Sequence, residues 1–375
     1  MIGYINLRYG HEEVKVDMAT FRKIGILSSG GDAPGMNAII RAVARKALDA
    51  GVEVVGILGG YSGLIKNQMI PLSPRTVSNI ISRGGTILYS DRCPEFKTEE
   101  GMQRAIATCR SNEIDAIVAI GGDGTFRGAT DLTNHGIPTV GIPGTIDNDI
   151  TATDYTIGFD SAMNTTMNMI DCLRDTCESH ARCNVVEVMG RDCGQLALNT
   201  ALASGAVAAV IPEMPFNEAE LLDRISKLHE NGKRSFLVVV SEGVRTEDGR
   251  KYGEILTAKI QAQTGIESRF TRFGHVVRGG TPTMRDRYTA TTMGVRAVEL
   301  LLAGKSNVVI IKRFGKVTHV DINYALIADR TYKGKLQPGD LDAFSPEQVK
   351  ALLDLAEERR NEIANAYEIV GVTSK

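Results

Sequence analysis

Residues 24–50 carry the sequence IGILSSGGDAPGMNAIIRAVARKALDA. A short apolar run at 24–27 comes first, a glycine-rich turn follows, and apolar residues then recur at helical spacing up to Gly51. A continuous apolar run of this kind predicts a strand buried on both faces, and a glycine after a periodic segment is a helix stop. Strand, turn and helix in this order form the repeating unit of a doubly wound parallel sheet.

The same alternation recurs along the chain. Apolar runs that predict buried strands lie at residues 24–27, 52–58, 116–120, 139–142, 184–188, 207–211 and 236–240. Segments with helical spacing lie between them, at residues 36–50, 162–175 and 218–231. The sequence therefore predicts an α/β fold with mostly parallel sheets covered by helices, in which ligands bind at the carboxyl ends of the strands.

The C-terminal tail predicts one more helix. Ser345 is placed to cap it, and Pro346 is its first residue. A single apolar stripe then follows, made of Val349, Leu352, Leu353 and Ala356. Nothing in this tail suggests chemistry.

Composition excludes several classes of protein. The chain has 375 residues, which suits one large or two medium domains, and 43% of them are apolar. Its formal net charge of −2, with mixed signs, argues against a nucleic-acid or membrane-surface protein. No apolar run approaches the roughly 20 residues of a membrane helix. Six cysteines without a C-x-x-C pair suggest neither a zinc site nor a thioredoxin-like motif, and they fit a reducing cytoplasm.

Residues 1–20 are expected to form an N-terminal extension before a core that begins near Phe21. They carry several charged residues and lack the apolar segment of a signal peptide. Two interpretations stay open: Met18 is the true start, or the segment is a surface arm.

The turn after the first strand, Ser29 to Asn37, is a candidate phosphate loop. Glycine at a strand end lets the backbone approach a phosphate closely, and the N-terminus of the following helix offers N–H groups. A tight turn that needs positive φ explains the same residues equally well.

A second glycine-rich turn, IGGDGT at residues 120–125, follows another predicted strand. A triphosphate needs close backbone amides and a hard cation, and Asp123 supplies an oxygen suited to Mg²⁺, through water. Thr125 is expected to cap the next helix and to donate to phosphate. Related motifs occur in NAD kinases and diacylglycerol kinases, and a plain turn is the alternative.

A third loop, PGTIDND at residues 143–149, ends the next predicted strand. Asp147 and Asp149 can divide the work, one near the metal and the other accepting a proton from an attacking hydroxyl. An Asx-rich turn explains the residue types but not their setting. Acidic loops at consecutive strand ends would repel each other unless a cation lay between them, which favours a shared Mg²⁺ and phosphate site.

Basic side chains at element ends complete the pattern. Arginine forks suit phosphate oxygens, although for any single arginine a solvated surface charge is the alternative. The set comprises Arg92, Arg182, Arg191, Arg269, His275 and Arg278.

Together these segments resemble the bacterial-type ATP-dependent 6-phosphofructokinases, from about Lys23 to about Ala325. The most specific matches are residues 30–32 (GGD), 83–86 (RGGT), 92–98 (RCPEFKT), 143–149 and 187–191 (EVMGR). The resemblance implies a homotetrameric, allosteric enzyme of glycolysis that transfers the γ-phosphate of ATP to the 1-hydroxyl of fructose 6-phosphate. It implies two lobes: residues 21–158 with 277–327 for ATP, and residues 159–276 with 328–375 for the sugar phosphate.

The resemblance also implies residue roles. Asp147 is similar to the general base and Asp123 to the Mg²⁺-site carboxylate, and Asp149 is similar to a residue that supports either the metal or the base. Thr145 and Arg191 complete the implied catalytic set. The implied ATP site comprises Gly31, Tyr61, Arg92, Cys93, Phe96, Gly122, Asp123, Gly124 and Thr125. The implied sugar-phosphate contacts are Thr145, Asp147, Arg182, Met189, Gly190, Arg191, Glu242, Arg269, His275 and Arg278. Two of these, Arg182 and Arg269, resemble residues that reach in from the neighbouring subunit.

Three rival functions are weighed against this one. In the pyrophosphate-dependent branch, Asp and Lys occupy the positions that resemble Gly124 and Gly144, and glycine at both leaves room for ATP. An NAD or lipid kinase would not explain the Asp147 loop or the basic set. A non-enzymatic nucleotide-binding regulator would be expected to lack Asp123 or Asp147.

The family's effector site, which binds Mg-ADP or phosphoenolpyruvate, is only partly matched. Its basic residues have counterparts at Arg41, Arg45, Arg174 and Lys233. Three other positions depart from the family: Val207 replaces a glutamate, Asn231 an arginine and Asn79 an aspartate. Weak or absent activation by Mg-ADP is therefore expected, and plain interface ion pairs are the alternative role for the arginines.

Overall fold

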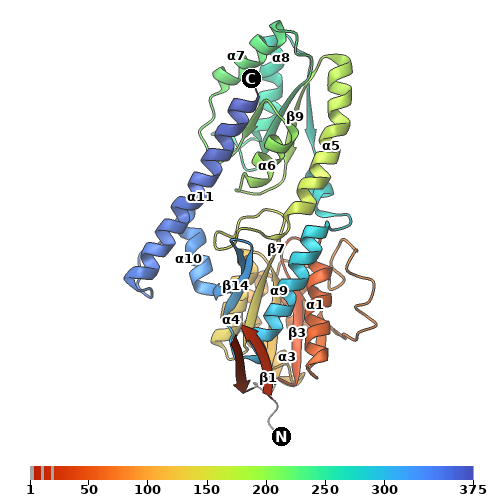
Figure 1. Ribbon diagram of the computed structural model, residues 1–375, viewed down its shortest axis with the longest axis vertical. Helices are drawn as coiled ribbons and strands as arrows, with labels where there is room; N and C mark the ends of the chain where they lie inside the picture. Colours follow the sequence, from red (N-terminus) through yellow and green to blue (C-terminus); the bar gives the residue numbers. More distant parts are fainter. Residues whose placement is uncertain (1–3, 10–11, 18–20, 375) are drawn as a thin grey trace. The chain divides into compact units, whose positions relative to one another are not determined.

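The computed structural model describes residues 4–9, 12–17 and 21–374 (Figure 1). The chain divides into two compact units: Met1–Thr145 with Ile150–Gly158 and Gly280–Leu353, and Ile146–Asp149 with Phe159–Gly279 and Asp354–Lys375. The sequence placed residues 328–353 in the second lobe, and residues 146–149 and 277–279 in the first. Helix α10 (Ile322–Tyr332) packs on elements of the first unit, which accounts for the first of these differences.

The first unit is built on one mixed sheet. Its strands are β3 (Lys23–Ser28), β4 (Glu53–Ile57), β5 (Met69–Pro71), β6 (Ala116–Gly121), β7 (Thr139–Thr145), β13 (Val308–Arg313) and β14 (Lys316–Asp321). The order is β14-β13-β7-β6-β3-β4-β5, with β13 to β4 parallel and the two edge strands antiparallel. A two-residue strand, β8 (Ile157–Gly158), pairs with the end of β7. The carboxyl ends of β3, β6 and β7 are therefore neighbours.

Helices cover this sheet: α1 (Met36–Asp49), α2 (Gly60–Ile65), α3 (Glu99–Ser111), α4 (Asp123–Asn134), α9 (Met284–Leu302) and α10. Helices α1 and α9 lie side by side (Figure 1). A Cβ atom added at Gly294 would lie 2.7 Å from the Cβ of Ala42. Glycine is thus needed for these helices to approach so closely.

The second unit has a smaller, wholly parallel sheet. Its strands are β9 (Cys183–Val188), β10 (Ala208–Val210), β11 (Phe236–Ser241) and β12 (Ser268–Arg272), in the order β10-β11-β9-β12. Its helices are α5 (Phe159–His180), α6 (Gln195–Ser204), α7 (Glu218–Glu230) and α8 (Tyr252–Thr264). Apolar side chains of the strands, such as Phe236, Val238 and Val240, are fully buried and supply the core.

The predicted strands are all confirmed, with ends that shift by up to three residues, and the three predicted helices are α1, α5 and α7. In the two sheets, the sequence analysis missed β5, β8, β12, β13 and β14. Strand β12 carries Arg269 and Arg272 at a sheet edge, and β14 is a partly exposed antiparallel edge strand. These edge strands lack the continuous apolar run on which the prediction depended. Strand β13 lies inside the sheet and does begin with such a run, at residues 308–311, which the prediction overlooked.

The C-terminal helix α11 runs from Pro346 to Thr373, as predicted, and the hydroxyl of Ser345 accepts a hydrogen bond from the N–H of Gln348 at 3.3 Å. The predicted apolar stripe is wrong at Leu353, which is 51% exposed, whereas its neighbour Leu352 is fully buried. A straight helix with 3.6 residues per turn keeps positions 352, 356 and 363 on one face and turns 353 away from it.

The N-terminal extension contains strands β1 (Tyr4–Tyr9) and β2 (Glu12–Asp17), which pair antiparallel with each other. Within the described residues, neither strand joins another sheet. The alternative start at Met18 lies outside the described residues. Among the helices that the structure describes, none is long and apolar enough to cross a membrane.

Candidate active site

The two glycine-rich turns of the first unit lie side by side at the ends of β3 and β6. The N–H of Ser29 donates to the carbonyl of Ile120 at 3.0 Å, and the hydroxyl of Thr125 donates to the carbonyl of Ser29 at 3.1 Å. A Cβ atom at Gly121 would lie 2.3 Å from that hydroxyl and 2.5 Å from the Ser29 carbonyl oxygen. The close approach of the turns therefore requires glycine at position 121.

Each turn leads into a helix without a side-chain cap. Helix α1 begins after Gly35, whose φ is 103°, and α4 begins after Gly122. A helix N-terminus that no side chain caps presents backbone N–H groups and a positive dipole end, which is the usual setting for phosphate. The structure thus places two such termini on adjacent strands of one sheet.

The sequence predicted that Thr125 caps α4, and the structure shows this to be wrong. The helix begins at Asp123 with Gly122 as its N-cap, so Thr125 is its third residue. The single hydroxyl proton of Thr125 is donated to the carbonyl of Ser29. The side chain therefore ties the two turns together.

Asp123 has the features of a cation ligand. One carboxylate oxygen, Oδ2, lies 2.9 Å from the Nη2 atom of Arg127. The other, Oδ1, is buried and has no hydrogen-bond partner among the described residues. Such an oxygen fits Mg²⁺, which takes one or two carboxylates and keeps water and phosphate as its other ligands. The described residues contain no group of three or more acidic, His or Cys side chains that could hold a metal.

Tyr61 and Phe96 lie beneath the second turn rather than on an open surface. Their rings stack with centroids 4.1 Å apart, and each residue is only 4% exposed. The Tyr61 hydroxyl donates to the carbonyl of Thr125 at 2.6 Å. The structure shows them supporting the turn, and their contact with a nucleotide stays a prediction.

Arg92 and Cys93 are brought close to the first turn. The N–H of Gly30 donates to the carbonyl of Asp91 at 3.4 Å, and the hydroxyl of Ser90 donates to the carbonyl of Gly30 at 2.5 Å. The neighbouring Gly31 and Arg92 are exposed, and Cys93 is half-buried. These predicted ATP-site residues therefore share one surface of the first unit.

The third loop starts where β7 ends. Thr145 is its last residue, paired with Gly158 of β8, and its carbonyl accepts a hydrogen bond from the hydroxyl of Thr156 at 2.7 Å. Asn148 has φ 51°, and its side-chain amide donates to Oε1 of Gln195 at 2.6 Å. The backbone on both sides of Asp147 is thus anchored.

Asp147 is a buried acid with a raised pKa. It is 4% exposed, and its pKa rises from 3.8 to about 6. Burial is the main cause, and the negative charge of Asp149 adds to it, while Arg278 and Arg191 lower the pKa again. The second unit therefore brings this carboxyl group into the field of two of the predicted arginines.

Gly190 and Arg191 form a turn that Glu242 holds. One oxygen of Glu242, Oε1, accepts from the N–H of Gly190 at 3.2 Å and from that of Arg191 at 3.0 Å. A Cβ atom at Gly190 would lie 2.4 Å from the carbonyl oxygen of Cys193, and φ at Gly190 is 140°. Only glycine permits this turn, which leaves Met189 buried and the side chain of Arg191 exposed.

Arg182 and Arg269 meet on one carboxylate. The Nε atom of Arg182 lies 2.9 Å from Oε2 of Glu267, and Arg269 pairs with the other oxygen of Glu267. His275 and Arg278 belong to the short 3₁₀ helix Gly274–Arg278 that follows β12. Arg269, His275 and Arg278 therefore lie on the edge strand β12 and the turn after it. Arg182 directly precedes β9, the strand that pairs with β12.

The sequence singled out Glu187 only as part of a motif and gave it no role. This glutamate is 2% exposed at the end of β9, and its Oε1 atom lies 2.8 Å from Nζ of Lys251 and 2.6 Å from Nε of Arg272. An acid inside an otherwise apolar strand, NVVEV, was the available signal. Arg272 joins β9 to β12, the strand that leads to His275, and Lys251 joins β9 to the start of α8.

The residues of the implied effector site are divided between the two units. Arg41 and Arg45 lie on α1, and the side chain of Arg45 donates to the carbonyl of Pro74 at 3.4 Å. Arg174 donates to the carbonyl of Ser204, and Val207 is buried. Burial lowers the pKa of Lys233, and the charge of Arg174 lowers it further.

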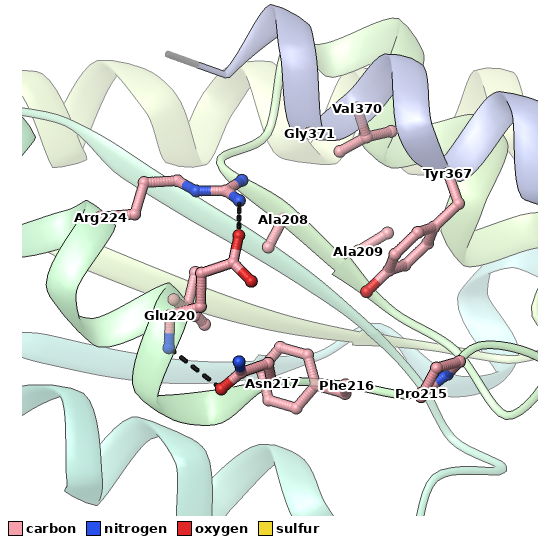
Figure 2. A pocket seen from close by; sticks show the side chains of 11 residues that line it. Ala208, Ala209, Pro215, Phe216, Asn217, Glu220, Arg224, Tyr367, Val370 and Gly371 are labelled. Carbon is pink, nitrogen blue, oxygen red and sulfur yellow. Dashed lines mark hydrogen bonds and ion pairs between the residues drawn. The ribbon is translucent and has the colours of Figure 1, made fainter.

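A cavity of about 140 Å³ lies elsewhere in the second unit, between α7 and the end of α11. Figure 2 shows Tyr367, Val370 and Gly371 on one side and Phe216 with Glu220 on the other. The Glu220 carboxylate is already paired with Arg224 at 2.9 Å. None of the described residues that line this cavity belongs to the predicted site.

Comparisons with known proteins identify the family of the chain. The family model described as phosphofructokinase matches residues 23–301. The chain is 50% identical over 305 residues to an ATP-dependent 6-phosphofructokinase of Clostridium novyi, covering 81% of this chain and 94% of that protein.

Two solved yeast structures are also similar. The Pichia pastoris phosphofructokinase in the T-state is 34% identical, with a TM-score of 0.81 over 95% of this chain, and the phosphofructokinase of Saccharomyces cerevisiae is 29% identical, with a TM-score of 0.80 over 92%. This chain spans 40% and 49% of those two yeast chains, respectively.

Proposed function

The chain belongs to the phosphofructokinase family, and from this premise we propose that it is an ATP-dependent 6-phosphofructokinase. It transfers the γ-phosphoryl group of Mg-ATP to the 1-hydroxyl of fructose 6-phosphate. The products are fructose 1,6-bisphosphate and ADP. The observation that carries the proposal is the buried Asp147 carboxyl group, with its raised pKa, between the charges of Arg191 and Arg278.

Asp147 is suited to act as the general base. A pKa of about 6 keeps most of the group ionised at neutral pH and makes it a stronger base than an ordinary aspartate. The carboxylate accepts the proton of the 1-hydroxyl as the hydroxyl oxygen attacks the γ-phosphorus atom and the bond to the ADP oxygen breaks. Arg191 and Arg278 both favour the charged form of the base and are placed to meet phosphate oxygens.

The first unit supplies the nucleotide site. The N-termini of α1 and α4 bind phosphate oxygens through backbone N–H groups, with Gly31, Arg92 and Cys93 beside them. Asp123 would hold Mg²⁺ through its buried Oδ1 atom, as described above. The cation supplies charge neutralisation for the transferred phosphoryl group.

The choice of ATP over pyrophosphate is supported by Gly124. A Cβ atom built there meets no other atom within 4 Å, so the space beside this glycine is open. A longer side chain would occupy that space. The position therefore leaves room for the α-phosphate of a nucleotide.

The assembly and its location complete the proposal. We propose a homotetramer in which Arg182 and Arg269 reach the sugar phosphate of the neighbouring subunit. We also propose that the enzyme works in the cytoplasm, which is supported by its six free cysteines.

One assay tests the proposal. The purified protein is given fructose 6-phosphate with either ATP or pyrophosphate, and formation of fructose 1,6-bisphosphate is followed through coupling enzymes. Turnover with ATP and little with pyrophosphate is expected. Asp147→Asn should lower kcat by on the order of 10²–10⁴, whereas Asp171→Asn, at an exposed position on α5, should not change it. Absence of turnover by the wild type would favour a binding regulator, and turnover only with pyrophosphate would favour the other branch.

A further inference from the structure

The short strand β8 fixes the end of β7 in the first unit. Its residues Ile157 and Gly158 pair with Gly144 and Thr145, the last two residues of β7. The proposed base, Asp147, follows Thr145 by two residues. The contacts that hold β8 therefore also hold Thr145, after which the loop that carries Asp147 begins.

Asp286, in the first turn of α9, is hydrogen-bonded to β8 and to Tyr155, which lies two residues before that strand. Its Oδ1 atom accepts a hydrogen bond from the N–H of Gly158 at 2.8 Å and another from the hydroxyl of Tyr155. Asp286 is fully buried. A carboxylate in the first turn of a helix interacts favourably with the helix dipole, which helps it to remain charged there.

Strand β8 packs closely against the elements on both sides of it. Gly158 has φ 107°, and a Cβ atom there would lie 2.6 Å from the Cβ of Ala33. A Cβ atom at Gly35 would lie 2.6 Å from Cγ2 of Ile157 and 3.6 Å from Cβ of Asp286. Strand β8 is thus wedged between the first glycine-rich turn and the start of α9.

The ring of Tyr155 is held from its other side. The guanidinium carbon of Arg285 lies 4.4 Å from the centroid of this ring. A cation over an aromatic face is attracted to it, so the ring stays in place even when the hydroxyl is removed. Tyr155→Phe therefore removes the hydrogen bond to Asp286 while the ring keeps its contact with Arg285.

We propose that Asp286 is a positioning residue for catalysis. Its hydrogen bonds with Tyr155 and with the N–H of Gly158 hold β8 in place. Strand β8 in turn holds the Thr145 end of β7, where the loop that carries Asp147 begins. The proposal rests on the proposed function, because it concerns the same phosphoryl transfer. A buried carboxylate does not itself bind nucleotide phosphates. Although the first glycine-rich turn packs on β8, we expect the loss of Asp286 to act mainly on kcat and to change the KM for ATP by no more than about twofold.

The test compares Asp286→Ala, Asp286→Asn and Tyr155→Phe with the control Asp321→Ala. Asp321 caps α10 of the same unit, accepting from the N–H of Asn323 at 2.7 Å and of Tyr324 at 3.2 Å. Its loss should destabilise the unit without touching β8. The readouts are kcat, the KM for ATP and for fructose 6-phosphate, the midpoint of thermal unfolding, and hydrogen exchange of the segment 144–158.

We expect kcat to fall at least tenfold in Asp286→Ala and about threefold to tenfold in Tyr155→Phe, with the KM for ATP within twofold of the wild type. Asp286→Asn keeps an acceptor oxygen and should recover most of the activity. Segment 144–158 should exchange faster in Tyr155→Phe, and not in Asp321→Ala. If Asp286→Ala does not fold, Tyr155→Phe decides the question.

The proposal is overturned if the folded variants keep kcat within twofold of the wild type. It is also overturned if Asp321→Ala, at an equal loss of thermal stability, loses as much activity. A wild-type protein without kinase activity would instead contradict the proposed function. In that case hydrogen exchange alone decides whether Asp286 holds β8.

Discussion

The carboxylate of Glu242 accepts a hydrogen bond from the backbone N–H of Arg191, 3.0 Å away. The same oxygen accepts from the N–H of Gly190, and Arg191 has the left-handed φ of 53°. A left-handed conformation is unfavourable for a residue other than glycine and persists only where neighbouring groups fix it. Glu242 therefore determines the direction in which the Arg191 side chain leaves the turn, in addition to any contact with the sugar.

We predict that Glu242→Ala raises the KM for fructose 6-phosphate at least tenfold and also lowers kcat, because two backbone N–H groups lose their acceptor and Arg191 is released. Glu242→Gln keeps an acceptor oxygen and should be milder. Glu247→Ala, on an exposed loop of the same unit, serves as the control. Initial rates at varied fructose 6-phosphate provide the measurement. Equal defects in the Ala and Gln variants would mean that charge, and not the hydrogen bonds to the turn, is what matters.

A second prediction concerns the stability of the fold. The pKa of Asp147 is raised in the folded state, so between pH 4 and pH 6 the folded protein binds a proton that the unfolded chain has lost. The contribution of Asp147 to the free energy of unfolding must therefore fall as the pH rises through this range. Asp147→Asn removes the effect. The variant should match the wild type near pH 4 and exceed its free energy of unfolding by up to about 3 kcal/mol at pH 7.5.

Denaturant unfolding of both proteins at the two pH values checks this prediction, with Asp171→Asn as the control. The other titrating groups are common to both proteins and cancel in the comparison. A stability difference that does not change with pH would show that Asp147 is not held in an unfavourable charged state.

The apolar strand pattern explains why so much of the fold could be predicted. Runs such as Ala116–Ile120 are continuous because their strands are buried on both faces, and each ends in a polar turn. Since adjacent parallel strands end at one edge of a sheet, the turns at Ser29 and Gly122 could be expected to lie together. Their hydrogen bonds confirm it.

Contacts between residues far apart in the chain were beyond such reasoning. The bond from Thr125 to Ser29 and the bonds from Glu242 to the Gly190 turn depend on the packed sheet, and no local periodicity encodes them. The same is true of Asp286, whose role depends on a two-residue strand too short to give a sequence signal. The error at Leu353 arose differently, because two adjacent apolar residues leave the face of a helix ambiguous.

A third prediction tests the choice of phosphoryl donor. In Gly124→Asp the new side chain has room to fit, because no atom lies within 4 Å of the position that its Cβ would take, so the protein should fold normally. A carboxylate there would oppose a nucleotide phosphate by charge and by volume. We expect the KM for ATP to rise at least tenfold, with the thermal midpoint within a few degrees of the wild type. Gly371→Asp, near the end of α11, is the control, because an added Cβ atom there also meets no atom within 4 Å. An unchanged KM for ATP in Gly124→Asp would contradict the proposed location of the nucleotide.

A fourth prediction tests whether subunits share their active sites. Arg269 and Asp147 would belong to the same site only across a subunit interface. Chains carrying Arg269→Ala and chains carrying Asp147→Ala should each be inactive alone, and mixed tetramers should regain part of the wild-type activity. The two chains are given different tags, mixed under dissociating conditions, and purified on both tags before assay. A failure of verified mixed tetramers to regain activity would place all the residues of a site in one chain.

The last prediction concerns regulation. In the second unit burial lowers the pKa of Lys233, and the nearby charge of Arg174 lowers it further. An anion that binds these two cations would offset their repulsion. Val207 is buried and offers no side-chain oxygen for a cation, and Asn231 ends α7 without a cationic side chain. We therefore expect little or no activation by Mg-ADP, with a residual response to a small anion such as phosphoenolpyruvate. Saturation curves for fructose 6-phosphate at fixed ATP, with and without each compound, give the measurement.

Asn231→Arg restores a phosphate donor at the C-terminus of α7, where a cation is also favoured by the helix dipole, and it should strengthen the response to ADP. Allosteric coupling amounts to about 1–3 kcal/mol, so one charged contact is enough to matter. A wild-type curve that is sigmoidal and becomes hyperbolic with ADP would contradict the prediction, because it would show that the site works without a carboxylate at position 207.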